Sequence, residues 1–307
     1  MRKVSVIGGG NVGASAALYV AEMGIADVVL FDIVEGMPQG KALDLLESRS
    51  VRGFDAKVRG TNDYKDIDGS DVVVVTAGFP RKPGMSRSDL LAKNAEIVTT
   101  VAENVKTYAP KATVITVTNP LDVMTYLMFR KTGFSENRVV GMAGVLDATR
   151  FRCFIAEELG VSANDVQAMV LGGHGDSMVP LPRYATVAGI ALPDLLPEDV
   201  IGRLVQRTRD GGAEIVALLK TGSAYYAPAA SAAQMVEAVL LDRKRILPAA
   251  AHLSGQYGLK DVYIGVPVQL GAGGVEKIIE LKLSDSEKAA LHKSAADVSA
   301  GITELSL

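Results

Sequence analysis

Residues 4–21 read VSVIGGGNVGASAALYVA, a short apolar run that enters a glycine-rich turn and leaves it as an alanine-rich helical pattern. Gly8, Gly10 and Gly13 give the spacing G-x-G-x-x-G between a strand and a helix. In that context one glycine permits the tight turn, one lets the backbone approach a pyrophosphate, and one lets the helix pack close to the strand. The first N–H groups of the helix have no partners within it and carry the positive end of its dipole. The stretch therefore predicts a βα unit that binds a dinucleotide through its phosphates.

An acidic residue follows at the distance that this kind of turn requires. The next predicted strand, residues 27–32, ends at Asp32, which lies 19 residues after Gly13. An acid about 20 residues beyond the glycines accepts a hydrogen bond from the 2′-hydroxyl of the adenosine ribose. Its charge would repel a 2′-phosphate, so the residue favours NAD over NADP. The alternative, a glycine-rich turn that binds nothing, is disfavoured because strand, helix and acid are in register.

The rest of the first half alternates short β-branched runs with stretches of helical period, which is typical of βαβ units and a parallel sheet. The runs are almost purely apolar, as expected of strands buried on both faces. The predicted strands are residues 4–7, 27–32, 71–76, 113–117 and 138–140. Apolar residues at intervals of three and four predict amphipathic helices over residues 86–108 and 121–131. The predicted fold class is therefore α/β, with a doubly wound parallel sheet of the Rossmann type.

From about Gly144 onward the alternation gives way to longer helices and fewer strands, without a linker to mark the change. Helices are predicted over residues 151–159, 198–219 and 223–241, and strands over residues 261–268 and 277–283. Ser284 followed by Glu287 is a capping signal for a final helix that ends near Leu305. We predict a dinucleotide-binding domain over residues 1–144 and an α+β substrate domain over residues 145–307.

The composition argues against several classes of protein. The 307 residues carry 32 basic and 35 acidic side chains, a formal net charge of -3, so no global positive field attracts nucleic acid or an anionic membrane. The first apolar run is too short for a signal peptide, and no uninterrupted apolar run reaches the ~18 residues of a membrane span. The single cysteine, Cys153, cannot form an intramolecular disulfide or a thiolate metal cluster, and we expect it to be a small buried residue. We expect a cytoplasmic protein that binds no metal, membrane or nucleic acid.

Only three histidines occur, so the search for a general acid or base that works near neutral pH is short. His174 lies in the sequence LGGHGDS, and glycines on both sides suit an imidazole that a ligand must approach closely. His292 lies among charged residues of the last predicted helix, where we expect it to be solvated, and His252 has no identifiable partner. The local sequence alone leaves open the alternative that His174 is a loop histidine without a role.

Two further groups of charged residues strengthen this candidate. In LDATRFR, residues 146–152, Asp147 and Arg150 are three residues apart and therefore share one face of a helix. Taken alone, that spacing is more often a surface salt bridge. The segment GFPRKPGMSR, residues 78–87, joins a strand end to a helix and holds three cations. Such a basic segment lies where an α/β sheet binds its ligands, although an ordinary solvated loop is the alternative.

Five segments match motifs of one protein family and follow one another in the same order as in that family: VIGGGNVG, AGFPRKPGMSRSDLL, VTNPLDVM, GVLDATRFR and LGGHGDSMVPL. Through them the chain resembles, essentially end to end, the lactate and malate dehydrogenases, and most closely the lactate-dehydrogenase-like bacterial type of malate dehydrogenase. The resemblance implies that His174 is the acid/base, that Asp147 orients it, and that Arg150 binds the 1-carboxylate of the substrate. It also implies that Arg87 polarises the substrate carbonyl and that Asn119 contacts both cofactor and substrate.

The resemblance further implies NAD as the cofactor. The residues expected to contact it are Gly8, Gly10, Asn11, Val12, Gly13, Asp32, Asn94, Val117, Thr118 and Asn119. At the position of Arg81 the family has glutamine in typical lactate dehydrogenases and arginine in malate dehydrogenases. A guanidinium there can pair with the distal carboxylate of malate or oxaloacetate, and it would be left unpaired over the methyl group of pyruvate. The implied reaction is therefore the NAD-dependent oxidation of malate to oxaloacetate.

Two other functions are weighed against this one. The same chemistry on another 2-hydroxy acid, such as lactate, is disfavoured by Arg81. A catalytically silent NAD-binding module has no need for the full set of Arg81, Arg87, Arg150, Asp147 and His174. In the family, subunits pair as dimers and often as tetramers through a region that includes residues 37–46. We therefore expect two kinds of partner, a dicarboxylate substrate and further copies of the chain in a homodimer or homotetramer.

Overall fold

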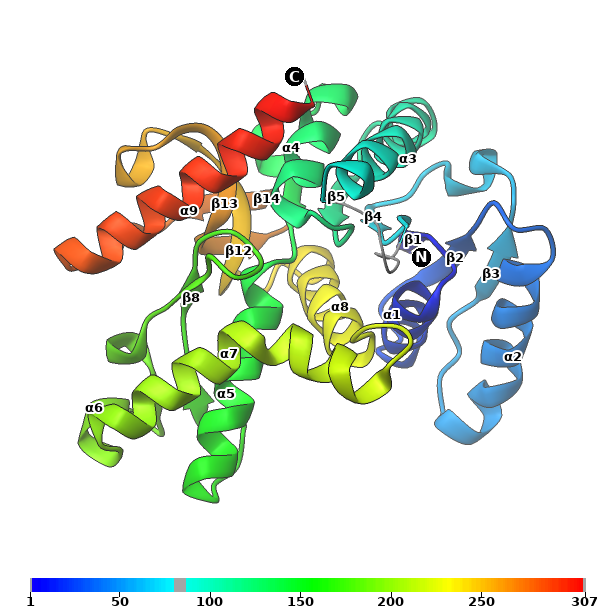
Figure 1. Ribbon diagram of the computed structural model, residues 1–307. Coiled ribbons are helices and arrows are strands. Elements are labelled where there is room, and N and C mark those ends of the chain that lie inside the picture. Colours follow the sequence, from blue (N-terminus) through cyan, green and yellow to red (C-terminus); the bar gives the residue numbers. More distant parts are fainter. Residues whose placement is uncertain (1, 80–86, 306–307) are drawn as a thin grey trace.

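The computed structural model describes residues 2–79 and 87–305, without the side chain of Arg87. A nine-stranded sheet runs through the centre of this part of the chain (Figure 1). Its first six strands pair in parallel in the order β3-β2-β1-β4-β5-β6. Their bounds are β1 Lys3–Ile7, β2 Asp27–Phe31, β3 Val58–Thr61, β4 Val72–Val75, β5 Thr113–Thr116 and β6 Val139–Gly141. This is the doubly wound order, and its ligands bind outside the carboxyl ends of the strands where the order reverses, here β1 and β4.

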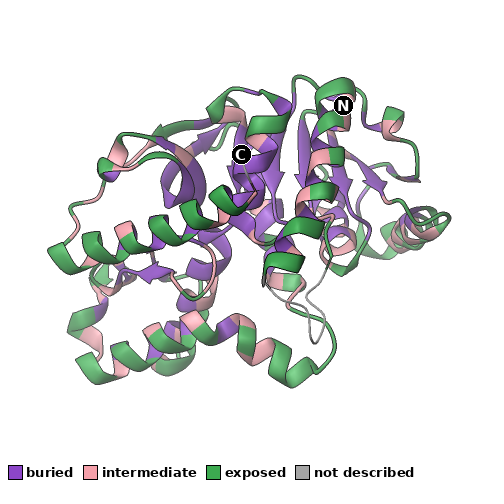
Figure 2. Ribbon diagram, turned by 45° about the horizontal axis from the view of Figure 1, so that its top comes forward, coloured by how far each residue is buried: buried purple, intermediate pink, exposed green. Residues whose placement is uncertain are grey.

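Helices cover both faces of the parallel strands. The first half contributes α1 Asn11–Glu22, α2 Met37–Arg52, α3 Arg87–Tyr108 and α4 Leu121–Thr132. On one face α3 packs against α4, and on the other α1 packs against α8, Tyr226–Leu240, which the second half supplies (Figure 1). The strands between these layers are buried, as is most of α4, whereas α2 and α3 are exposed on their outer sides (Figure 2). Burial on both faces explains why the strands are apolar throughout.

The second half extends the same sheet. Its long antiparallel strands are β12 Arg245–Ser254, β13 Lys260–Gly271 and β14 Gly274–Ile278. They join the parallel strands through the pairing of Ala250 in β12 with Gly141 in β6. The remaining helices are α5 Gly144–Leu159, α6 Leu192–Leu195, α7 Glu198–Leu219 and α9 Asp285–Glu304. A second core forms where α5 packs against α7, around Phe151 and Ile155.

Short elements complete the second half and the connections. The short strands are β7 Val166–Gln167, β8 Val170–Leu171, β9 Val179–Pro180, β10 Thr186–Val187 and β11 Ile190–Ala191. The 3₁₀ turns are η1 Tyr64–Ile67, η2 Glu136–Arg138, η3 Pro182–Tyr184 and η4 Gln256–Gly258. Strands β8 and β9 pair with each other and flank residues 172–178, the segment that contains His174 and the glycines around it.

Most of the predicted elements are confirmed, and the fold class with them. The capping signal at Ser284 is a complete capping box, in which Ser284 Oγ accepts from the Glu287 amide and the Glu287 carboxylate accepts from the Ser284 amide. The strand predicted over residues 277–283 is wrong, because β14 lies earlier, at residues 274–278. The elements that were not predicted include the polar helix α2, the edge strand β3 and the alanine-rich strand β12.

Cys153 is exposed, contrary to the prediction that it is buried. It lies on α5 between Phe151 and Ile155, which are both fully buried. A residue two positions from each of them faces the opposite side of the helix, and here that side is solvent. Partial burial and the neighbouring Glu157 raise the pKa of the thiol, so the chain does not activate it as a nucleophile.

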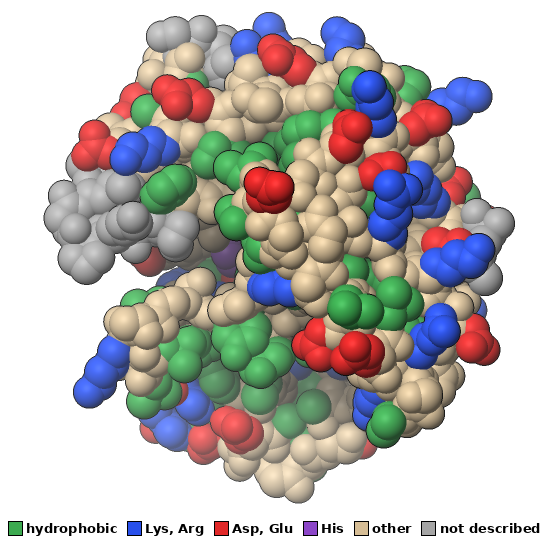
Figure 3. Space-filling view, turned by 90° about the vertical axis from the view of Figure 1, so that its right-hand side faces the viewer, with side chains coloured by type: hydrophobic (Ala, Val, Ile, Leu, Met, Phe, Trp, Pro, Cys, Tyr) green, Lys and Arg blue, Asp and Glu red, His purple; other side chains and the backbone are tan. Residues whose placement is uncertain are grey.

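Acidic and basic side chains are interspersed on the face of the molecule shown in Figure 3, without a continuous patch of one sign. Across residues 2–79 and 87–305, no helix combines the length and the apolar composition needed to cross a membrane. Within the same ranges no group of histidine, cysteine, aspartate and glutamate side chains is arranged to hold a metal ion.

Candidate active site

The glycine-rich turn joins β1 to α1 at the carboxyl edge of the parallel strands. A Cβ atom on Gly13 would lie 1.8 Å from the carbonyl oxygen of Gly8, and one on Gly8 would lie 2.6 Å from the backbone nitrogen of Ala77. Only glycine fits at these two positions, and Gly8 also has a φ of 108°, which disfavours any side chain. Next to Gly10, by contrast, the space within 4 Å is open. Gly10 caps α1 without a side chain, so the helix N-terminus presents its amides to that space.

Asp32 lies beside this turn, at the carboxyl end of β2. Its Oδ2 accepts from the Gly9 amide at 2.6 Å, and its Oδ1 accepts from the Val34 amide at 3.0 Å. Lys41, from α2, donates to the Gly9 carbonyl at 2.7 Å. The turn and the acid are therefore one fixed unit, and the open space at Gly10 with the fixed carboxylate fits the pyrophosphate and ribose of a dinucleotide. Sequence reasoning missed Lys41, because α2 itself was not predicted.

Asn94 connects the ends of two neighbouring parallel strands. Its side-chain oxygen accepts from the Phe79 amide at 2.6 Å, and its side-chain nitrogen donates to the Asn119 carbonyl at 2.7 Å. Thr118 Oγ1 donates to the Ala77 carbonyl at 2.7 Å. The buried Asn94 thus holds the segments after β4 and β5 together, and the side chain of Asn119 remains exposed at this edge.

His174, Asp147 and Arg150 come together at the start of the second half. Asp147 lies in the first turn of α5 with its side chain 1% exposed, and its Oδ2 is 2.9 Å from Nδ1 of His174. Arg150, one turn later, forms an ion pair with Asp147 across 3.5 Å. The side chains of His174 and Arg150 are 13% and 12% exposed. The surface salt bridge that the spacing also allowed is therefore wrong, because this pair is buried and shared with the histidine.

The charges around His174 favour its protonated form. Burial lowers the pKa of the imidazole, but Asp147 and then Asp122 more than offset burial, so the pKa is raised. Burial also lowers the pKa of Arg150, an effect that Asp147 partly reverses. An imidazole with a raised pKa next to a fixed carboxylate can take up and release a proton near neutral pH.

Unused hydrogen-bonding atoms gather at this place. Within the described ranges, the buried side-chain atoms without a hydrogen bond are Thr116 Oγ1, Asp122 Oδ1, Asp147 Oδ1 and Arg150 Nε. Three of the four belong to Asp147, Arg150 and Asp122, the acid whose Oδ2 accepts from the His174 amide. Because buried polar groups are normally satisfied, such a cluster is expected where a polar ligand binds.

Two glycines of α7 make room for Arg150. A Cβ on Gly211 would lie 3.0 Å from Cδ of Arg150, and one on Gly212 would lie 3.7 Å from both terminal guanidinium nitrogens. A side chain larger than hydrogen at Gly211 would push the guanidinium aside. A pair of glycines inside a predicted helix needs a packing reason, and this signal could have identified them from the sequence.

The other two histidines take part in separate contacts. His252 lies between two carboxylates, with Nδ1 2.9 Å from Glu136 and Nε2 3.1 Å from Asp261. The prediction that His292 is solvated is wrong, because its Nε2 is 2.8 Å from the Tyr257 carbonyl and its side chain is half-buried. Arg81 and the Arg87 side chain, both assigned to the substrate, lie outside the described residues.

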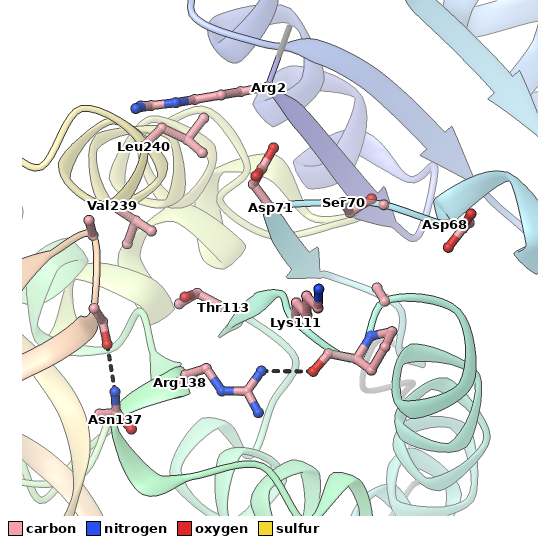
Figure 4. Close-up of a pocket in the computed structure, with 15 residues that line it drawn as sticks. Arg2, Asp68, Ser70, Asp71, Lys111, Thr113, Asn137, Arg138, Val239 and Leu240 are labelled. Atoms are coloured by element: carbon pink, nitrogen blue, oxygen red, sulfur yellow. Dashed lines mark hydrogen bonds between the residues drawn. The ribbon is translucent and has the colours of Figure 1, made fainter.

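A cavity of about 610 Å³ lies at the amino end of the parallel strands, away from the residues above (Figure 4). Its polar lining is largely bonded within the protein: Arg138 donates to the Pro110 carbonyl and Asn137 donates to the Gly273 carbonyl. None of the predicted site residues lines it. It therefore contributes nothing to the assembled site, which lies at the carboxyl ends of the same strands.

Comparison with known proteins covers nearly the whole chain. A family model described as the lactate/malate dehydrogenase NAD binding domain matches residues 2–141, and the family's alpha/beta C-terminal domain matches residues 144–306. The malate dehydrogenase of Methanosarcina mazei is 57% identical over 100% of both chains. The structure of malate dehydrogenase from Salinibacter ruber is 56% identical with a TM-score of 0.95, covering 99% of this chain and 97% of that one. The lactate dehydrogenase of Cryptosporidium parvum, solved with lactic acid and β-nicotinamide adenine dinucleotide, is 48% identical with a TM-score of 0.96, covering 99% and 98%.

Proposed function

The chain belongs to the lactate/malate dehydrogenase family, and from this premise we propose that it catalyses the reversible, NAD-dependent oxidation of (S)-malate to oxaloacetate. The observation that carries the proposal is the buried His174–Asp147 pair with Arg150 one turn away. His174 lies at the carboxyl edge of the parallel strands, as the glycine-rich turn and Asp32 do, since its amide bonds Asp122 in the first turn of α4, which follows β5. An acid/base, a carboxylate-binding cation and a dinucleotide turn together match the needs of a 2-hydroxy acid dehydrogenase.

Each side chain has a distinct task in this mechanism. Nδ1 of His174 donates to Asp147, which leaves Nε2 to accept the proton of the malate hydroxyl. Asp147 fixes that tautomer and stabilises the imidazolium that forms. Arg150 grips the 1-carboxylate through a planar pair of N–H groups, which lysine does not offer. In the reverse direction the imidazolium returns its proton to the carbonyl oxygen of oxaloacetate.

The glycine-rich turn and its neighbours hold the cofactor. We assign the phosphates to the amides that follow Gly10, the adenosine ribose to Asp32, and the nicotinamide side to residues 117–119. When bound, NAD accepts the hydride that leaves C2 of malate. Asn94 contributes by joining the two segments that border this part of the site, through its bonds to Phe79 and Asn119. Asn119 then presents its exposed side chain to both ligands.

Arg87 and Arg81 complete the proposed site from the segment that follows β4. Arg87 polarises the carbonyl as negative charge develops on its oxygen, which is the task of a preorganised cation. Arg81 pairs with the distal carboxylate and so separates malate and oxaloacetate from lactate and pyruvate. Solved structures at 48% identity include a lactate dehydrogenase as well as malate dehydrogenases, so this assignment depends on Arg81 rather than on overall likeness.

The substrate assignment is tested by Arg81→Gln. The variant should lose roughly 10- to 100-fold of the preference for oxaloacetate over pyruvate, because the distal carboxylate loses its partner and the methyl group no longer meets a desolvated charge. NADH consumption is measured with both substrates, and kcat/KM ratios are compared with wild type. Lys82→Gln, which removes the neighbouring cation, is the matched control and should keep the preference. Unchanged selectivity in Arg81→Gln would show that another residue reads the distal carboxylate.

The cofactor assignment is tested by Asp32→Ser. Loss of a charged acceptor for the ribose hydroxyl should lower kcat/KM with NADH by about tenfold and raise the ratio of NADPH to NADH use. Asp27→Ser, at the start of β2, is the control. The Asp27 side chain accepts from the Lys57 backbone amide, and its replacement is expected to leave cofactor preference unchanged. If Asp32→Ser kept the wild-type preference for NADH over NADPH, another residue would bind the ribose hydroxyl.

We also propose that the enzyme works in the cytoplasm as a homodimer or homotetramer. Leu43 on α2 and Leu218 on α7 are exposed apolar side chains of the kind that a subunit interface covers. The small residues of α8, in contrast, pack within the chain, with Ala232 and Ala233 buried. The division at residue 144 stays a prediction, since the sheet passes continuously from one half to the other.

A further inference from the structure

We propose that Asp122 is a positioning residue that fixes the backbone of His174 and whose negative charge helps the imidazole to hold its proton. Asp122 lies in the first turn of α4 and is 4% exposed. Its Oδ2 accepts from the backbone amide of His174 at 2.7 Å, across 52 residues of sequence. The inference rests on the proposed role of His174 as acid/base, and none of the roles assigned above includes Asp122.

The backbone around His174 is held at three successive residues. Gly172 exchanges hydrogen bonds with Gly265 of β13, at 2.9 and 3.0 Å. The Gly173 amide donates to Oγ of Ser294 on α9 at 2.8 Å, and Ser294 is fully buried. Asp122 completes the set at His174 itself. Three elements far apart in the sequence therefore define the position of the histidine, and of their anchors only Asp122 carries a charge.

The charges that face His174 come from two helices. In the described residues, α5 supplies Asp147 and Arg150, and α4 supplies Asp122. The contact from α9 is the neutral Ser294. Burial raises the pKa of Asp122 to about 6, although the hydrogen bond from the His174 amide and the positive imidazolium oppose that rise. Above that pH Asp122 is a second carboxylate that stabilises the imidazolium, so its removal should lower the pKa of His174.

The carboxylate of Asp122 also makes fewer hydrogen bonds than expected of a residue with a purely structural role. Its Oδ1 is buried and makes no hydrogen bond in the described structure. A buried carboxylate with one unpaired oxygen is costly, and an uncharged acceptor would serve the backbone bond at lower cost. The charge itself is therefore the feature that needs a function, and the nearby imidazole provides one.

The test compares the pH dependence of malate oxidation in wild type, Asp122→Asn and Ser294→Ala. Asparagine can still accept from the His174 amide but has no charge. Because malate oxidation needs neutral His174, the acidic limb of its kcat/KM profile should move to lower pH by roughly one unit. Oxaloacetate reduction needs the imidazolium, so its alkaline limb should move in the same direction. Ser294→Ala removes an anchor of similar burial without removing charge, and it should slow the reaction while leaving both limbs in place.

A second readout does not depend on activity. With only three histidines in the chain, the ring protons of His174 can be followed by NMR and assigned by their loss in a His174→Asn variant. The His174 resonance should titrate at lower pH in Asp122→Asn than in wild type, and at the wild-type pH in Ser294→Ala. If Asp122→Asn does not fold, Asp122→Ser takes its place, since it also removes the charge and keeps a short acceptor.

The outcomes separate this inference from the proposed function. If wild type and folded Asp122→Asn titrate at the same pH in both readouts, Asp122 has only a structural role and the inference is wrong. If wild type fails to oxidise malate, the proposed function is wrong, and the NMR titration still decides whether Asp122 shifts the pKa of His174. A shift of equal size in Ser294→Ala would also overturn the inference, because position rather than charge would then explain it.

Discussion

Replacing His174 by asparagine should lower kcat by roughly 10³-fold in both directions, because the reaction then lacks its acid/base. Asparagine can still hydrogen-bond Asp147, so the position of the segment is largely kept. It offers no nitrogen that exchanges a proton near neutral pH. Asp32 and the glycine-rich turn are untouched, and the Kd of NADH should stay within a factor of two or three. Steady-state rates with oxaloacetate and with malate, together with NADH fluorescence titration, measure both effects.

His292→Gln is the matched control for this prediction. His292 is half-buried on α9 and bonded to the Tyr257 carbonyl, so its replacement changes a histidine without touching His174. Its expected kcat is close to that of wild type. If His174→Asn kept more than a tenth of the wild-type kcat while folded, the acid/base would have to be another group, and the mechanism above would not stand.

Five of the six parallel strands, all except β3, could be predicted because their rules are local. Strands such as β4, with four consecutive valines, are buried on both faces and read as apolar runs, and the glycine-rich turn has a fixed spacing after β1. Element β12 obeys no such rule. It is rich in alanine, which has low strand propensity, and it forms because β13 pairs with it along almost its whole length. Its register depends on a partner that no local pattern shows.

Helix α2 was missed for a related reason. Pro38 and Ala42 are its only buried residues, so it lacks the apolar stripe that identifies an amphipathic helix. As a result, the contact of Lys41 with the glycine-rich turn was not predicted either. A functional contact on a polar helix becomes visible only after the helix has been placed against the sheet.

In the site, the residue types could be predicted better than their surroundings. The three-residue spacing of Asp147 and Arg150 placed them on one face of α5, but taken alone the spacing is more typical of a surface ion pair. Burial of the pair decides between the two, and for Arg150 it involves close packing against Gly211 and Gly212 of α7, about sixty residues further along the chain. The contact from Asp122 to the His174 amide is likewise a result of tertiary packing that no sequence spacing encodes.

Arg150→Lys should lower kcat/KM for oxaloacetate by roughly 10²- to 10³-fold, mainly through a higher KM. The substitution keeps the charge but loses the planar pair of donors that matches a carboxylate. Truncating one partner of a buried, hydrogen-bonded charge pair costs about 2–5 kcal/mol, which is about 30- to 5,000-fold and includes the expected loss. A Cβ on Gly211 would lie 3.0 Å from Cδ of Arg150, so α7 packs closely against the stem of this side chain. Initial rates over a wide range of oxaloacetate concentration separate KM from kcat.

Arg152→Lys provides the control on the same helix. Arg152 donates to the carbonyls of Val166 and Ala163, at 2.7 and 3.1 Å, and thus links α5 to the backbone near β7. Lysine there should reduce the thermal stability slightly and leave KM for oxaloacetate within about a factor of two, since Arg152 lies two residues from Arg150 and therefore on another side of α5. If Arg150→Lys matched this control in KM, the 1-carboxylate would bind elsewhere, and the two glycines facing Arg150 would need a different explanation. A loss of kcat at unchanged KM would instead place Arg150 at the reacting carbonyl, because only interactions formed in the transition state change kcat alone.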